Sequence, residues 1–406
     1  MSATRIAYLV GSYPAVSHTF IAREVEGLRA RGVDVHTVSV RRTPPEQLLT
    51  DADRRAAEET SVILPPDPRQ LAGAHLRTLL RRPRRYLSTL ALAARLSPGG
   101  ARAGLWQLFY FAEAILLAER LRRRGIRHVH AHFANVATAV ALLVAHLGER
   151  DGCTWSFTMH GPTEFDDVTR YALAEKVRRA RFVACIGDYC RSQLMKLTPP
   201  DQWDKLEIVH CGVDPDRFAA VDRAERANGH LHVLCVGRLV PDKGQALLVE
   251  AIAAMRARGR DVTATLVGDG PDRPALEAAA RPLDGAVELA GAVGQDRIRE
   301  LYADADVFCL PSFAEGVPVV LMEAMATGLP VVTTRIMGIP ELVEDGRAGL
   351  LVRPGRPDDL ASALERLAGD PEGRAAMGRA GRDRVAADYD IARSVEALHT
   401  AFERHL

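Results

Sequence analysis

The sequence of 406 residues is long enough for two domains of ordinary size, and 47% of its residues are hydrophobic, as in globular proteins. Its formal net charge of +1 argues against a general affinity for nucleic acid. The apolar stretch 6–10 is too short for a signal peptide, and those near 105–118 and 133–147 carry polar side chains that argue against a membrane span. The six cysteines lack metal-ligand spacing, so we expect reduced core residues in a cytoplasmic protein.

Strands and helices alternate through both halves of the chain. In the first half we expect helices at 18–32, 133–147 and near 170–180, with strands at 5–10, 34–40, 127–131, 153–160, 181–187 and 206–212. In the second half we expect strands at 231–237, 262–268, 286–291, 305–311 and 330–334. This alternation predicts an α/β fold with two doubly wound, parallel, Rossmann-like sheets.

A polar stretch at 213–230 separates the two halves and is typical of a linker. We therefore expect an N-terminal domain at 1–212 and a second domain at 231–388, facing an interdomain cleft. Ligands in such folds bind at the carboxyl ends of the strands. A final helix at 389–406 follows the second domain.

The stretch PSFAEGVPVVLMEAMATGLP (311–330) joins a buried strand to a helix. Pro318 suits the first helical turn, and a helix N-terminus presents N–H groups and a positive dipole end to an anion. Glu315 lies in the loop, and Glu323 is the one charge in VVLMEAMA. A carboxylate in so apolar a helix needs a partner, which is either an internal Arg or Lys or a ligand.

A second loop, VGRLVPDKG (236–244), also follows a strand and opens a helix. The chain contains four lysines against forty-nine arginines, so Lys243 in this loop hints that a compact point charge was needed. The alternative is a solvated pair of loop cations, Arg238 and Lys243. LVGDGPDR (266–273) is a further glycine turn between strand and helix, which is a weak signal by itself.

Glu315-x7-Glu323 followed by AMATGLPVV, together with Gly-Arg-Leu-x-x-x-Lys-Gly, resembles the retaining glycosyltransferases of family 4, which have the GT-B fold. The resemblance implies that Glu315 holds donor-sugar hydroxyls, Glu323 holds the ribose, and Arg238 and Lys243 neutralise the diphosphate. It implies no metal and no other cofactor. It also implies that the final helix crosses back onto the first domain. The donor-binding residues implied are Gly237, Arg238, Lys243, Gly268, Gly270, Glu315, Gly316, Val317 and Glu323.

The same resemblance extends more loosely to the first half. It implies that His160, at the end of a strand in MHGPTEFDD, contacts the donor sugar near the reacting carbon. The catalytic set is therefore His160, Glu315, Arg238 and Lys243. The acceptor-side candidates are Gly11, Thr19, Arg23, His132, Thr163 and Glu164.

Two other patterns have simpler interpretations. In HVHAHFAN (128–135), we favour hydrogen-bonded core histidines over catalytic ones for His130 and His132. Asp304-Ala-Asp306 mimics a metal-binding motif of another transferase fold, but it joins a helix to a buried strand, so we interpret it as structural.

Residues 68–112 contain eight arginines and no carboxylate. Such a basic amphipathic segment suits an anionic membrane surface, and an Arg-rich solvated face is the alternative. The resemblance favours membrane contact, which predicts a peripheral location at the inner face of the membrane.

We predict a glycosyltransferase that moves a sugar from a nucleotide-sugar, UDP-sugar favoured over GDP-sugar, to an acceptor hydroxyl in polysaccharide or glycolipid synthesis. A natural-product acceptor is one alternative. A sugar-nucleotide epimerase and a catalytically silent sugar-nucleotide-binding protein are others. A glycosidase is disfavoured because it needs two carboxylates on opposing faces of the bond, whereas Glu315 and Glu323 come from one junction.

Overall fold

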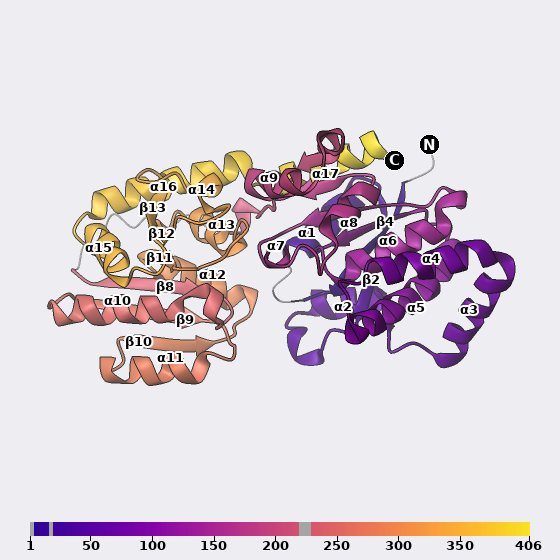
Figure 1. Cartoon of the computed structure of the whole chain (residues 1–406). Coiled ribbons are helices and arrows are strands. Elements are labelled where there is room, and N and C mark those ends of the chain that lie inside the picture. The colour runs from indigo at the N-terminus through magenta and orange to yellow at the C-terminus, as the bar shows by residue number, and fades with distance from the viewer. Residues whose placement is uncertain (1–3, 16–18, 219–228) are drawn as a thin grey trace. The chain divides into compact units, whose positions relative to one another are not determined.

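Two parallel β-sheets organise the chain in the computed structural model, which describes residues 4–15, 19–218 and 229–406. They belong to two units, here called unit 1 (Met1–Val209 with Val395–Leu406) and unit 2 (His210–Ser394). Figure 1 shows helices on both faces of each sheet, which explains why the strands are apolar on both sides. No helix among the described residues has the length and apolarity to cross a bilayer.

The sheet of unit 1 has the strand order β3-β2-β1-β4-β5-β6-β7. Its strands are β1 (Arg5–Ser12), β2 (Asp34–Arg41), β3 (Ser61–Leu64), β4 (His128–His132), β5 (Thr154–Met159), β6 (Val183–Cys185) and β7 (Leu206–Ile208). Its helices before the final one are α1 (Thr19–Ala30), α2 (Asp51–Glu59), α3 (Pro68–Arg81), α4 (Pro83–Arg95), α5 (Ala101–Arg123), α6 (Val136–Gly148), α7 (Thr163–Asp166), α8 (Leu173–Arg179) and α9 (Asp188–Leu197).

The sheet of unit 2 has the strand order β10-β9-β8-β11-β12-β13. Its strands are β8 (Leu231–Val236), β9 (Val262–Val267), β10 (Val287–Gly291), β11 (Val307–Leu310), β12 (Val331–Thr334) and β13 (Gly349–Val352). The helices are α10 (Gln245–Ala257), α11 (Arg273–Ala280), α12 (Gln295–Asp304), α13 (Val319–Ala326), α14 (Ile339–Leu342), α15 (Pro357–Ala368), α16 (Pro371–Asp388) and α17 (Ile391–His405).

Both sheets have their topological switch point beside the first strand. In unit 1, β1 pairs with both β2 and β4, and in unit 2, β8 pairs with both β9 and β11. The connections leave these central strands in opposite directions, so the loops that follow them open a crevice at the carboxyl edge. The prediction of two parallel, Rossmann-like sheets is confirmed.

The ends of the expected domains differ in detail from the units. The boundaries fall at 209/210 and 394/395, beside the expected 212/213 and 388/389, and α17 begins in unit 2 and continues in unit 1. Residues 213–218, expected as linker, are packed in unit 2: Val213 N donates to Tyr389 O and Ile391 N donates to Val213 O, at 2.9 and 2.8 Å. Residues 219–228 of that linker lie outside the described residues.

Candidate active site

Glycines bring three loops of unit 2 together at the carboxyl ends of β8, β9 and β11. Gly244 has a φ of +63°, and a Cβ there would lie 2.2 Å from Pro311 O. Gly268 has a φ of +137°, and its Cβ would lie 2.0 Å from Gly237 O. Any other residue would force these loops apart, because real Cβ atoms do not approach a carbonyl oxygen so closely. Two of the glycine turns noted in the sequence therefore hold the edge of one site together.

Lys243 and Glu315 form an ion pair at this edge. Lys243 ends a short 3₁₀ turn (Pro241–Lys243) after β8, and its Nζ lies 2.5 Å from Glu315 Oε1. The same oxygen accepts a hydrogen bond from Ser312 Oγ at 2.7 Å. Glu315 is buried, with 6% exposure, so this charge-assisted pair is shielded from solvent screening.

Arg238 presents its cation differently. Its backbone oxygen accepts a hydrogen bond from Gln245 Nε2 at 2.8 Å, and Gln245 is itself buried at the start of α10. The Arg238 side chain is exposed and forms no ion pair with any described residue. The backbone is thus fixed while the guanidinium remains available to an anion at the carboxyl edge.

Glu323 lies in α13, one turn beyond the loop that carries Glu315. It is 5% exposed, and its Oε2 accepts a hydrogen bond from Tyr302 Oη at 3.3 Å. One partner of this carboxylate is therefore a hydroxyl from α12. The sequence predicts Pro318 in the first helical turn. In the structure Pro318 is instead the N-cap residue, one position before α13 begins.

The remaining donor-side candidates are backbone positions of the same loops. A Cβ at Gly270 would lie 2.2 Å from Leu239 O, and one at Gly338 would lie 2.4 Å from Gly316 O. Val317 is buried beside Gly316. Asp306 accepts a hydrogen bond from His232 N at 2.8 Å, which agrees with its structural interpretation.

In unit 1, His160 follows β5 and is linked to α1 through a second histidine. His132 Nδ1 lies 3.0 Å from His160 Nε2, and His132 Nε2 lies 3.2 Å from Glu24 Oε1. Tyr8 Oη donates to the same carboxylate oxygen of Glu24. His132 Nε2 faces Glu24 but forms no hydrogen bond with the described residues, and the tautomers decide which of His132 Nδ1 and His160 Nε2 donates to the other.

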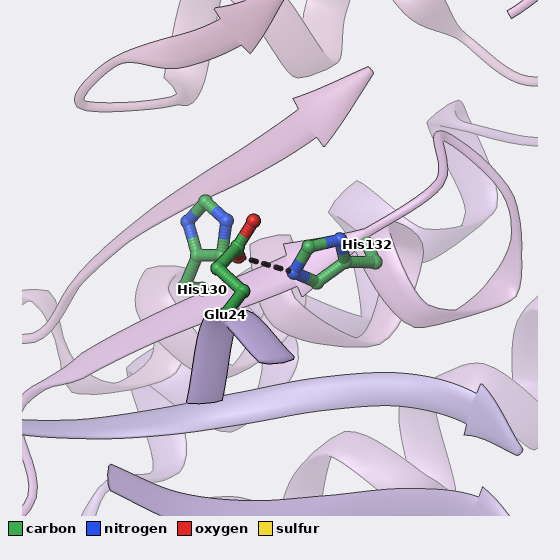
Figure 2. A group of neighbouring side chains, drawn as sticks. All are labelled: Glu24, His130 and His132. Atoms are coloured by element: carbon green, nitrogen blue, oxygen red, sulfur yellow. Dashed lines mark ion pairs between the residues drawn. The ribbon is translucent and has the colours of Figure 1, made fainter. Parts of the chain in front are cut away.

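Glu24, His130 and His132 have ligand atoms within 4.8 Å of one another, which could suit a metal ion (Figure 2). However, His130 already contacts two hydroxyls, Ser156 Oγ at 2.7 Å and Thr158 Oγ1 at 2.9 Å. Burial lowers the pKa of His130 well below its ordinary value, with help from the neighbouring histidines. His130 is therefore a neutral, hydrogen-bonded core residue, and the cluster fits a relay better than a ligand set.

A strained turn lies against His160. Phe133 has a φ of +65°, and its ring centroid is 4.5 Å from that of His160. The buried Lys176 Nζ donates to Ala134 O at 2.7 Å and to Asn135 O at 3.0 Å, which holds the turn. Burial lowers the pKa of Lys176 to about 7, although the charge of Glu164 raises it. Left-handed backbone in a non-glycine residue is stored strain of the kind found at functional sites.

The other acceptor-side candidates lie around the same carboxyl edge of unit 1. Gly11 is the last residue but one of β1, and Thr19 and Arg23 lie in the first turns of α1; all three are partly buried. Thr163 is exposed, whereas Glu164 is buried and accepts a hydrogen bond from Ala134 N at 3.2 Å.

The sequence did not single out the residues that hold these side chains in place. Ser312 precedes Glu315 by three residues, and this spacing in PSFAEG was a readable signal for a loop hydrogen bond. Glu24 carried no such signal, because it reads as one more polar residue of an amphipathic helix. Lys176 likewise reads as a helix-surface cation, although it is 3% exposed.

Comparisons with known proteins agree with this arrangement. Residues 17–217 match the family described as Glycosyltransferase Family 4, and residues 230–370 match the family described as Glycosyl transferases group 1. Among solved structures, Anabaena HepE in complex with UDP aligns over 99% of this chain and 100% of its own, with a TM-score of 0.74 and 18% identity. The galactosyltransferase WaaB of the lipopolysaccharide outer core aligns with a TM-score of 0.70, 15% identity, and coverage of 99% and 100%.

Three curated relatives match most of the chain. A D-inositol 3-phosphate glycosyltransferase of Kribbella flavida is 32% identical over 86% of this chain and 85% of its own. An α-D-kanosaminyltransferase of Streptomyces kanamyceticus is 27% identical over 94% and 97%. A putative colanic acid glycosyltransferase of Salmonella typhimurium is 28% identical over 95% and 96%.

The two Rossmann-like units and these relatives define a glycosyltransferase with the GT-B fold. The chain belongs to glycosyltransferase family 4.

Proposed function

We propose that this enzyme transfers a sugar from a UDP-sugar to an acceptor hydroxyl with retention of anomeric configuration and without a metal ion. The observation that carries the proposal is the ion pair between Lys243 and Glu315, 2.5 Å apart at the topological switch point of unit 2. This ion pair places the Lys243 ammonium group, which would bind a diphosphate, beside the Glu315 carboxylate, which would bind sugar hydroxyls. Arg238 adds a second, exposed cation at the same edge.

Each residue then has one task in the reaction. The bond from the anomeric carbon to the diphosphate oxygen breaks, and Arg238 and Lys243 neutralise the charge that grows on the departing diphosphate. The acceptor oxygen bonds to the same face of that carbon, and its proton passes to the departing phosphate oxygen. Glu315 orients the sugar, and Glu323 holds the ribose. His160 contacts the donor sugar near the reacting carbon.

The decisive experiment measures release of nucleoside diphosphate with and without acceptor, using UDP-sugars and GDP-sugars in parallel. Lys243→Ala should lower turnover about a hundred- to a thousandfold, as expected for loss of one transition-state donor. Lys196→Ala is the matched control, because that lysine is exposed on α9 in unit 1. Normal turnover of the Lys243→Ala protein, or acceptor-independent release alone, would contradict the transferase proposal.

The donor base and the metal are tested in the same assay. The GDP-mannose-dependent relatives of mycobacteria match about half of this chain, so GDP-mannose is the competing donor. A marked preference for GDP-sugars would overturn the UDP assignment. Activity should survive excess EDTA, because two side-chain cations face the diphosphate. Strict dependence on Mg²⁺ or Mn²⁺ would contradict the proposed role of Arg238 and Lys243.

For the acceptor we propose a growing polysaccharide or glycolipid at a membrane surface, with a soluble natural product as the alternative. The named relatives include enzymes of colanic acid and amylovoran biosynthesis. Large apolar side chains are exposed on α3, α4 and α5, which contact one another: Leu76, Leu79, Leu80, Leu87, Leu105, Trp106, Leu108 and Phe109. Exposed apolar side chains interleaved with arginines suit an interfacial position.

The structure changes how the basic segment 68–112 is tested. Arg82 pairs with Asp151 and Arg85 with Glu149, so acidic residues from another part of the chain neutralise part of the window. Leu80 and Leu87 are the better targets, with exposures of 73% and 58%. Leu80→Gln/Leu87→Gln should no longer sediment with phosphatidylglycerol vesicles at low salt, yet should retain activity on a soluble acceptor. Equal sedimentation of both proteins would favour the solvated face and a soluble acceptor.

A further inference from the structure

Unit 1 contains a pocket of about 360 Å³ at the edge of its sheet opposite His132 and His160. The pocket lies among the C-terminal parts of α3 and α5, the turn before β4 and the turn before β5. Those turns mark the amino ends of β4 and β5, whereas His132 and His160 lie at their carboxyl ends. The pocket is therefore separate from the residues assigned to sugar transfer.

The lining carries a clear excess of positive charge. Five arginines line the pocket, from α3, α5 and the adjoining turns: Arg77, Arg81, Arg82, Arg122 and Arg127. The lining includes two carboxylates, those of Glu119 and Asp151, so three cations are left without a matching negative charge. A pocket with an uncompensated cluster of guanidinium groups favours a polyvalent anion.

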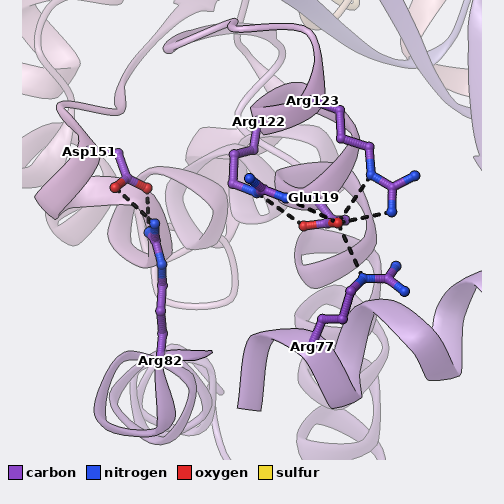
Figure 3. A network of polar contacts seen from close by, with 6 residues as sticks. All are labelled: Arg77, Arg82, Glu119, Arg122, Arg123 and Asp151. Atoms are coloured by element: carbon purple, nitrogen blue, oxygen red, sulfur yellow. Dashed lines mark hydrogen bonds and ion pairs between the residues drawn. The ribbon is translucent and has the colours of Figure 1, made fainter. Parts of the chain in front are cut away.

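The carboxylate of Glu119 holds two of these arginines in place and also pairs with Arg123, which lies outside the lining. Glu119 lies within 3.3 Å of Arg77, 3.2 Å of Arg122 and 3.0 Å of Arg123 (Figure 3). Burial alone would raise the pKa of Glu119, but hydrogen bonds from Arg122 and Arg123 lower it below its ordinary value. A single negative charge shared by three guanidinium groups orients them and neutralises only a part of their charge.

The rest of the lining shows the same combination of fixed and available cations. Arg82 donates from two nitrogens to the two oxygens of Asp151, and this fork holds the pKa of Asp151 below its ordinary value (Figure 3). Arg81 and Arg127 are exposed and form no ion pair with any described residue. These two can therefore turn towards a bound anion without breaking an existing pair.

We propose that this pocket binds a phosphate-bearing anion, a phosphomonoester or diphosphate group, at a site distinct from the donor diphosphate site. The planar fork of a guanidinium group matches two phosphate oxygens at once, and several oriented forks around one pocket favour phosphate over a monovalent anion. The pocket adjoins α3, whose Leu76 and Leu80 are exposed, so the same chemistry could come from a lipid headgroup or from a free phosphate compound.

Binding of inorganic pyrophosphate, measured by calorimetry, tests the site. All proteins carry Arg238→Ala/Lys243→Ala, so that the donor diphosphate site does not contribute to the signal. Arg81→Gln/Arg127→Gln should weaken pyrophosphate binding at least tenfold, and folding is not at risk because both side chains are exposed. The matched control is Arg55→Gln/Arg379→Gln, which removes two exposed, unpaired arginines outside the pocket and should leave binding unchanged.

Two results would overturn the proposal: no saturable pyrophosphate binding in the parent protein, or equal weakening by both double variants. A vesicle-sedimentation experiment then shows whether the phosphate group belongs to a lipid headgroup or to a free compound. If phosphatidate vesicles, but not phosphatidylcholine vesicles, sediment the parent protein and pyrophosphate releases it, the ligand is a lipid headgroup. If pyrophosphate binds and phosphatidate vesicles do not sediment the protein, the ligand is a free phosphate compound. Because the readout is binding, its failure would leave the proposed transferase activity untouched.

Discussion

The Lys243 ammonium group and the Glu315 carboxylate, 72 positions apart in the chain, lie 2.5 Å apart at the carboxyl edge of the unit 2 sheet. The two residues were assigned to different parts of the donor, Lys243 to the diphosphate and Glu315 to the sugar. If Lys243 binds the diphosphate as proposed, the diphosphate must compete with Glu315 for Lys243. Their contributions to donor binding are therefore coupled.

This coupling sets the expected behaviour of Glu315→Gln. The change removes the competing charge, so affinity for the nucleoside diphosphate should stay the same or rise by up to about tenfold, in line with a charge-assisted bond of roughly 1.5 kcal/mol. Turnover with the full donor should fall about a hundredfold, because the anomeric carbon is no longer oriented. Calorimetry with UDP and steady-state kinetics measure the two effects. Weaker binding of UDP to the variant would show that Glu315 supports binding of the nucleotide itself, which would contradict its assignment to the sugar.

Glu323 should behave in the opposite way. Glu323→Gln keeps the shape of the side chain but loses its charge, so it should weaken UDP and the full UDP-sugar by similar factors of about ten to a hundred. Tyr302→Phe is the control, since it removes the hydroxyl that reaches Glu323 Oε2 at 3.3 Å and leaves the carboxylate in place. It should weaken both ligands by less than Glu323→Gln. An effect of Glu323→Gln on the sugar-bearing ligand alone would contradict the ribose assignment.

The alternation of apolar strands and amphipathic helices was sufficient to predict both sheets and the strand-loop-helix junction at Glu315. Two edge strands were not predicted, β3 (Ser61–Leu64) and β13 (Gly349–Val352). The expected strand at 206–212 shortened to Leu206–Ile208. These differences lie at the edges of the sheets, away from the site.

The contacts within the site could not be predicted, since they depend on strand order. Lys243 meets Glu315 because β8 lies beside β11, and Glu24 meets His132 beside the pairing of β1 with β4. Neither neighbour relation follows from local sequence. The net charge around the basic segment 68–112 could not be predicted from local sequence either. Asp151, which neutralises Arg82, lies far beyond this segment in the chain.

The contact between Glu24 and His132, beside His160, leads to a kinetic prediction. Glu24→Gln should lower kcat about ten- to a hundredfold with little change in KM for the donor, because His132 loses the carboxylate that faces it and His160 is held less firmly. Glu26→Gln, on the exposed side of the same helix, is the control. An unchanged kcat in the Glu24→Gln protein would reduce Glu24 to a packing role.

Glu113 in α5 provides a test of stability that is independent of catalysis. Its Oε2 is buried and forms no hydrogen bond with the described residues. Burial raises its pKa from 4.5 to about 7, although Arg41 lowers it. The folded protein therefore binds more protons than the unfolded chain between these pH values. The stability that this group contributes is present below pH 4.5 and is lost as pH rises through about 7.

The corresponding change is Glu113→Gln, which cannot titrate. Relative to wild type, the unfolding free energy of this variant should rise as pH increases from 4.5 to 8, by at most roughly 3 kcal/mol for a shift of this size. Denaturant unfolding at several pH values measures the difference in unfolding free energy between the two proteins. Contributions from all other titrating groups cancel in this difference. Glu58→Gln, an exposed change on α2, should give a difference that does not vary with pH. If the plots of unfolding free energy against pH run parallel for wild type and Glu113→Gln, the prediction is contradicted. Glu113 would then be ionised in the folded protein, and its buried Oε2 would have a hydrogen-bond partner in solution.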